Sequence, residues 1–112
     1  MESILTTIKK MIGIAEEYAH FDTDIIIYIN NALASLRQIG VGPASGFSIS
    51  SDEQTWYDFI GNSTECEAIK TYIYLKVKMV FDPPSTSFVL AAMERQVQEL
   101  EWRLNVQSET EV

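Results

Sequence analysis

Residues 64–105 read TECEAIKTYIYLKVKMVFDPPSTSFVLAAMERQVQELEWRLN, two apolar-periodic segments on either side of a double proline. Thr64 and Glu67 have the spacing of a capping box, which predicts a helix that runs to about Phe81. Apolar residues recur every three or four positions in both segments, which is typical of helices that bury one face. They are Cys66, Ile69, Ile73, Val77 and Val80 in the first segment and Leu90, Met93, Val97, Leu100 and Leu104 in the second.

Asp82, Pro83 and Pro84 form a helix break between these segments. Neither proline can donate a backbone hydrogen bond, and Pro83 disfavours helical geometry at Asp82. Asp82 can cap the next helix with Pro83 in its first turn, and Ser85 and Ser87 are alternative caps. We expect this last helix to end near Asn105.

The first forty residues predict two more helices, each closed by a glycine followed by an apolar residue. Residues 3–12 have helical apolar spacing, and Gly13 fits the left-handed position that ends a helix. Asp22 is a good N-cap for a long helix that ends at Gly40. The β-branched run at 25–29 would also suit a strand, but the apolar stripe continues to Ile39 and favours a helix. The stripe consists of Ile25, Ile29, Ala32, Leu36 and Ile39.

Residues 42–50 are rich in glycine and serine and predict a loop, with a short hairpin as the alternative. Ser51 and Gln54 resemble a capping box for a short third helix, Asp52 to Ile60. The sequence therefore predicts an all-α fold, a small bundle of about five helices with a loop or short hairpin after the second. We expect one domain over residues 1–106, followed by an acidic flexible tail over residues 107–112.

The charge balance argues against nucleic-acid binding. The 112 residues carry 16 acidic and 8 basic side chains, a formal net charge of -8. The basic residues are dispersed, and none lies between Arg37 and Lys70, so no cluster favours contact with phosphates. No apolar run approaches the roughly 20 residues that a membrane helix needs, and no secretory signal is recognisable. We expect a protein of the reducing cytosol, without a membrane partner.

The residue types that an active site or metal site needs are sparse. His20 is the only histidine and Cys66 the only cysteine, and they lie far apart in the sequence. A zinc site needs three or four ligands of these or carboxylate types. An exposed loop histidine and a half-buried structural cysteine are the simpler interpretations. The sequence therefore predicts a protein that is not an enzyme and that holds no cofactor or metal.

Aromatic residues are numerous for so small a domain. Burial in the core is the simpler interpretation for Trp56. Trp102 lies two residues past Leu100, so it should face away from the apolar seam. Trp and Arg concentrate at subunit contacts, which makes Trp102 and Arg103 the best candidates for one.

A series of stretches follows one another along nearly the whole chain. They are residues 24–30 (DIIIYIN), 39–43 (IGVGP), 46–47 (GF), 55–61 (TWYDFIG), 70–76 (KTYIYLK), 81–84 (FDPP) and 101–105 (EWRLN). This order resembles the small head-tail connector (neck adaptor) proteins of tailed phages and of prophages in Gram-positive bacteria. The helix break and the EWRLN ending are its most specific parts, and neither is a catalytic motif.

The resemblance implies a structural subunit of the virion neck, assembled in the cytoplasm of the bacterial host. Such a subunit joins a dodecameric ring under the portal protein, extends the DNA channel and receives the next neck or stopper protein. DNA passes through the lumen without specific binding. The resemblance implies portal or subunit contacts at Trp102, Arg103, Asn105, Val106 and Gln107. It implies channel or next-ring contacts at Val41, Pro43, Phe47 and Ile49.

Without the resemblance, the residues also fit a small acidic helical regulator of the anti-repressor type. Such a protein would use its acidic face to bind a basic, DNA-binding partner. Neighbouring genes for portal, capsid and tail proteins would favour the connector.

Overall fold

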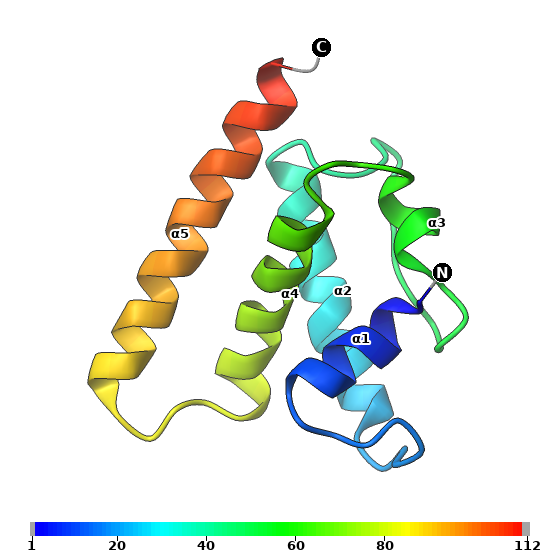
Figure 1. Ribbon diagram of the computed structural model, residues 1–112, viewed down its shortest axis with the longest axis vertical. Helices are drawn as coiled ribbons and strands as arrows, with labels where there is room; N and C mark the ends of the chain where they lie inside the picture. Colours follow the sequence, from blue (N-terminus) through cyan, green and yellow to red (C-terminus); the bar gives the residue numbers. More distant parts are fainter. Residues whose placement is uncertain (1, 111–112) are drawn as a thin grey trace.

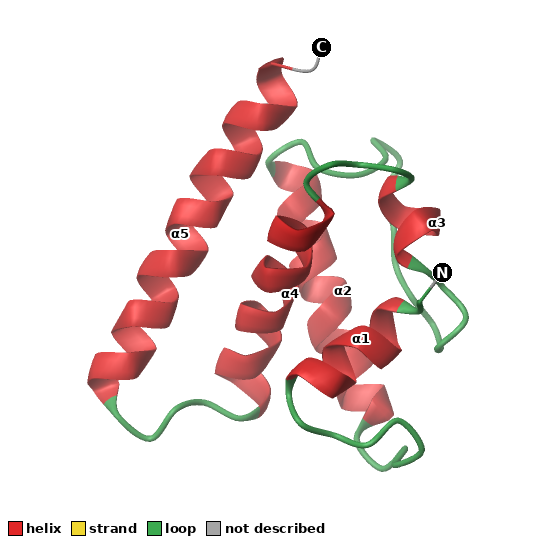
Figure 2. Cartoon of the chain, in the orientation of Figure 1, coloured by secondary structure: helices red, strands yellow, loops and turns green. Residues whose placement is uncertain are grey.

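The computed structural model describes residues 2–110, and this part of the chain forms five helices and no strand (Figures 1 and 2). The helices are α1 (Ile4–Met11), α2 (Asp22–Gln38), α3 (Trp56–Ile60), α4 (Cys66–Phe81) and α5 (Ser87–Thr110). The predicted all-α class is confirmed. Among these residues the only strand-like pairing is an isolated antiparallel bridge between Ser3 and Thr55, so the alternative of a hairpin over residues 42–50 is wrong.

Helices α2 and α4 pack side by side at the centre, with α1 across them and α5 along the outer side of α4 (Figure 1). Their predicted stripes contribute to the centre of the core. The fully buried members are Ile25, Ile29, Ala32 and Leu36 of α2 and Ile73 and Val77 of α4. Each large aliphatic side chain buried in this way contributes about 1.5–3 kcal/mol. The α4 stripe ends early, since Val80 is 59% exposed.

Trp56 joins the start of the chain to α3. Its side chain is 2% exposed, and its indole Nε1 donates a hydrogen bond of 2.8 Å to the Thr7 hydroxyl. The Ile4 amide donates to the Gln54 carbonyl at 3.0 Å, and the Trp56 amide to the Glu2 carbonyl at 3.4 Å. The core interpretation of Trp56 is confirmed, and its indole N–H is satisfied, as burial requires.

Lys9 is a buried cation that holds the connection between α1 and α2. Its Nζ lies 2.8 Å from Asp22 Oδ1 and 2.9 Å from each of the Glu16 and Tyr18 carbonyl oxygens. Two ammonium hydrogens therefore bond carbonyls, and the charge is paired with the Asp22 carboxylate. The prediction that Asp22 caps α2 is wrong: Phe21 is the N-cap and makes no side-chain cap bond, while the Asp22 carboxylate pairs with Lys9.

The predicted caps of α3 and α4 are also displaced. Thr55 and Asp58 form the capping box of α3, one turn later than Ser51 and Gln54. The Gln54 side-chain oxygen instead accepts from the amides of Ser50 and Ser51. Helix α4 has Glu65 at its N-cap without a side-chain bond, so the predicted Thr64 box is not formed.

The helix break lies where it was predicted, but a different residue caps α5. Asp82 is the C-cap of α4, and its carboxylate accepts from Lys78 Nζ at 2.7 Å, a bond that raises the pKa of Lys78. Thr86 precedes α5 and its hydroxyl accepts from the Val89 amide at 3.3 Å. Asp82, Ser85 and Ser87 are therefore not the cap.

Helix α5 runs on to Thr110, five residues past its predicted end. The expected boundary between domain and tail at residue 107 thus falls inside the helix, and residues 111–112 lie outside the described part. Along the seam, Val97, Leu100 and Leu104 are buried as predicted, and the Tyr72 hydroxyl donates to Glu101 at 2.7 Å. Burial, helped by this carboxylate, raises the pKa of Tyr72 well above its usual value.

Candidate assembly surface

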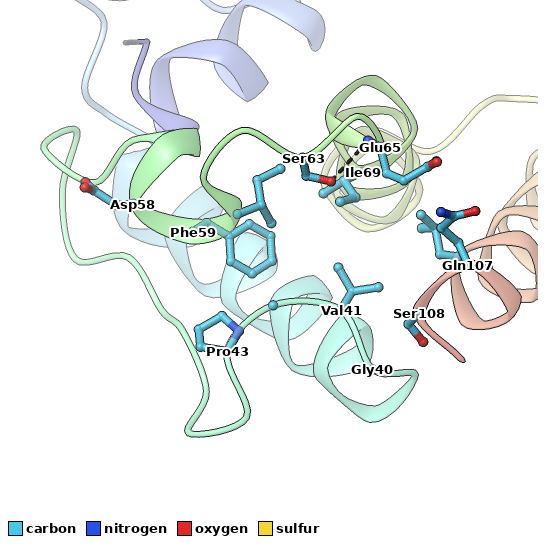
Figure 3. A pocket seen from close by; sticks show the side chains of 13 residues that line it. Gly40, Val41, Pro43, Asp58, Phe59, Ser63, Glu65, Ile69, Gln107 and Ser108 are labelled. Atoms are coloured by element: carbon cyan, nitrogen blue, oxygen red, sulfur yellow. Dashed lines mark hydrogen bonds between the residues drawn. The ribbon is translucent and has the colours of Figure 1, made fainter. Parts of the chain in front are cut away.

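A groove opens at the end of the bundle where α2 stops (Figure 3). Its volume is about 480 Å³. Its walls come from the loop after α2, the end of α3, the start of α4 and the last turns of α5. The lining residues are Gly40, Val41, Gly42, Pro43, Asp58, Phe59, Ile60, Ser63, Glu65, Ile69, Leu104, Gln107 and Ser108. Three stretches that are distant in sequence, 40–43, 58–69 and 104–108, thus share one surface.

Two glycines allow these segments to approach one another. Gly40 and Gly42 have φ of 92° and 89°, a region that side chains disfavour. A Cβ at Gly40 would meet the Ser108 hydroxyl oxygen at 2.6 Å, and a Cβ at Gly42 would meet the Phe59 ring at 2.5 Å. Glycine is therefore required at both positions for α5 and α3 to close on the loop.

Polar contacts fix α5 to the end of α2. The Asn105 side-chain amide donates to the Ile39 carbonyl at 3.1 Å, and the Ser108 hydroxyl lies 3.1 Å from the same oxygen. Carbonyls at a helix C-terminus lack intrahelical partners, so these side chains satisfy one that α2 leaves open. They explain why the helix continues past Asn105.

A smaller hollow of about 230 Å³ adjoins the groove and is lined by Glu65, Trp102, Arg103, Val106 and Gln107. Glu65 and Gln107 line both hollows. Trp102 is 68% exposed, as its position off the seam predicted, and Arg103 and Val106 are also exposed. Asn105 is half-buried and bound to Ile39. Four of the five predicted portal contacts therefore lie together at one accessible surface.

The predicted channel loop is divided by the structure. Val41 and Pro43 line the same groove as Gln107. Phe47 is half-buried, its ring centroid 5.1 Å from that of Phe59. Ile49 is buried, and its amide and carbonyl bond the Asn30 side chain at 2.8 Å and 3.0 Å. Val41 and Pro43 are therefore accessible to a partner, whereas Ile49 belongs to the core of this protomer.

Sequence reasoning missed several residues of this surface. Phe59, Leu104 and Ser108 line the groove without having been chosen as contacts. Outside this surface, at the other end of α5, Phe88 is 79% exposed, the most exposed large apolar side chain among those described. The spacing of Phe88, Trp102 and Val106, 14 and 4 residues apart, was a signal that could have united them on one helix face.

The chemistry-bearing residues do not gather at this surface. His20 is exposed in the connection before α2, with its ring against Phe21 at 4.8 Å between centroids. Cys66 is half-buried in the first turn of α4. Across residues 2–110, no three histidine, cysteine or acidic side chains are placed to hold a metal ion. No helix in the same range is long and apolar enough to cross a membrane.

Comparison with known proteins identifies the kind of molecule to which this surface belongs. No curated protein and no solved structure matches the chain significantly. Residues 4–111, nearly its whole length, match a family described as phage connector protein. Its members are structural proteins of the virion, and the helical fold and exposed end surface accord with such a role. The chain belongs to the phage connector protein family.

Proposed function

We propose that this protein is a subunit of a dodecameric ring that docks under the portal, extends the DNA channel and receives the next neck protein. Membership of the connector family implies assembly into an oligomer with portal and tail proteins. The observation that carries the proposal is the pair of adjoining hollows, which Val41 and Pro43 of the loop line together with the last turns of α5.

The surface around Trp102 has the properties of a binding hot spot. An exposed tryptophan and an arginine line the smaller hollow, and the adjoining groove is lined in part by the apolar side chains of Phe59 and Leu104. Buried aromatic and arginine anchors supply most of the energy of typical protein interfaces. Trp102 and Arg103 therefore act as the anchor for the portal or the neighbouring subunit, and the groove receives an apolar side chain of the partner.

A ring needs two different faces on each subunit, because its contacts are heterologous. The hollows at the end of α5 supply one. Exposed apolar residues on other helices, Ile27 of α2 and Tyr57 of α3, offer contacts for the other. The net charge of -8, repeated around the ring, repels the phosphates of the passing DNA. The DNA is therefore not bound through counterion release, which needs basic contacts to the phosphates.

Reconstitution with the portal protein of the same genome tests this function. Wild-type protein mixed with portal should give ring-shaped additions in electron micrographs and should sediment with the portal. Trp102→Ala should weaken that co-sedimentation at least about tenfold, as expected for a hot-spot residue. Tyr18→Ala, which removes an exposed aromatic outside both hollows and outside the proposed ring contacts, is the matched control.

Two results would count against the proposal. Failure of the wild-type protein to bind the portal at any concentration would overturn the ring function. Equal portal binding by wild type and Trp102→Ala would keep the function and remove Trp102 from the interface.

A further inference from the structure

The outward face of α5 carries a regular row of side chains. Helix α5 lies at the edge of the molecule with α4 on one side and no helix on the other (Figure 1). The row consists of Phe88, Ala92, Arg95, Glu99, Trp102 and Val106, and we call it the α5 row. At 100° per residue these positions fall within an arc of about 80°. All are exposed except Ala92, which is half-buried.

The spacing of the α5 row is the same in both directions along the helix. Its successive spacings are 4, 3, 4, 3 and 4 residues. If two copies of α5 lie antiparallel, with a two-fold axis at the level of Val97, each position of one copy faces another position of the second. Phe88 then faces Val106, Ala92 faces Trp102 and Arg95 faces Glu99.

Each of these facing pairs is complementary in size or in charge. Trp102 packs on the small Ala92, Phe88 meets the smaller Val106, and the two charges are opposite. Because the axis is two-fold, every contact occurs twice. Within the described residues neither Arg95 nor Glu99 takes part in an ion pair, so both are available to a second copy. In a parallel arrangement in register, Arg95 would face Arg95.

From this symmetry we infer that the free protein forms an antiparallel two-fold dimer through the α5 row, with a second copy of the chain as the occupant. The contact spans about 27 Å from Phe88 to Val106, at 1.5 Å per residue. It covers Phe88, Trp102 and Val106, three of the large apolar side chains that α5 exposes. The dimer is distinct from ring contacts, which are heterologous rather than two-fold.

The dimer has a consequence for assembly. Trp102 and Val106 belong both to the α5 row and to the hollow beside the groove. A dimer therefore covers residues that the ring would need, and it must dissociate before a subunit docks. The free pool of protein is kept from self-assembling until a portal competes for Trp102.

Charge reversal tests the dimer without confusion from misfolding, because the expected result includes restored dimerisation. Sedimentation velocity over a micromolar-to-millimolar series at low salt should show the wild type passing from monomer to dimer. Arg95→Glu and Glu99→Arg each place like charges at both symmetric contacts and should raise the dissociation constant at least about tenfold. The double variant Arg95→Glu/Glu99→Arg should recover the wild-type constant, and an equimolar mixture of the two single variants should form a heterodimer. Glu94→Arg, an exposed position outside the α5 row, should change nothing.

The outcomes separate this inference from the proposed function. A wild type that stays monomeric over the whole series overturns the dimer, as does a dimer that is indifferent to the charge reversals. Portal binding that depends on Trp102 in a strictly monomeric protein would leave the ring function intact and remove only the dimer.

Discussion

Helices α2 and α5 both carry a repeating apolar stripe, but they use it differently. Helix α2 buries Ile25, Ile29 and Leu36 completely against α1 and α4. Helix α5 packs mainly on α4, buries its seam only from Val97 onward, and leaves Phe88 and Trp102 exposed on its opposite face. Contiguous exposed apolar patches often mark interaction sites, whereas singly exposed apolar residues are common. The interior helix thus stabilises the protomer, while the outer helix leaves apolar surface accessible.

The largest loss of stability is expected from a substitution in the protomer core, at Trp56. Trp56→Ala removes a fully buried ring and its bond to Thr7, and should cost about 3–5 kcal/mol of unfolding free energy. Urea denaturation followed by circular dichroism measures it. Tyr57→Ala, an exposed neighbour, should stay within about 0.5 kcal/mol. Equal losses in the two variants would contradict the core role of Trp56.

A smaller interior effect is expected at Lys9. Lys9→Met keeps the apolar stem but removes the charge that pairs with Asp22 and bonds two carbonyls, which should cost about 2–3 kcal/mol. Lys10→Met is the adjacent control, because its pair with Glu2 is exposed and should contribute under about 1 kcal/mol. Thermal unfolding of both variants gives the difference. If Lys9→Met unfolded at the same temperature as the wild type, other contacts would hold the connection between α1 and α2.

The seam between the inner and outer helices should respond to alkaline pH through Tyr72. Its folded-state pKa is raised above the ordinary value of about 10. The unfolded chain therefore loses this proton first, so the stability of the neutral hydroxyl is fully present below pH 10 and declines as pH rises above it. Tyr72→Phe should lose about 1 kcal/mol at neutral pH and show a shallower decline above pH 10. Parallel slopes for both proteins would contradict the assignment.

The smallest effect is expected at the outer helix itself. Asn105→Ala removes one bond to the Ile39 carbonyl and should cost about 1 kcal/mol. The loss should be local: amide exchange should accelerate over residues 104–109 and stay unchanged in α2 and α4. Glu109→Ala, an exposed change in the same turn, is the control. Faster exchange throughout the protein would mean that α5 is part of the cooperative core.

The parts of the fold that could be predicted are those fixed by local pattern. Apolar spacing and the double proline gave the five helices, and Gly13 and Gly40 adopt the left-handed geometry expected of them. The cap assignment at Asp22 failed because a tertiary partner decided the outcome. Asp22 has the side chain of a good cap, but the buried Lys9 binds it, a contact that no local motif encodes.

The candidate surface was less predictable, for the same reason. The exposure of Trp102 followed from its position on α5. The groove required Gly42 to meet Phe59, 17 residues away, and Gly40 to meet Ser108. Ile49 was expected to face a partner, but the Asn30 side chain bonds both its amide and its carbonyl and draws it inward. Both outcomes depend on long-range contacts rather than on local sequence.

The hydrogen bond between Trp56 and Thr7 can form only late in the synthesis of the N-terminal half. The two residues are 49 positions apart, so a ribosome at usual elongation rates needs roughly 2 to 10 seconds to deliver the second after the first. During that interval Ile4 and Ile8, both fully buried in the finished protein, have only part of their cover. The nascent chain thus exposes apolar surface to chaperones early in translation, well before its assembly surface exists.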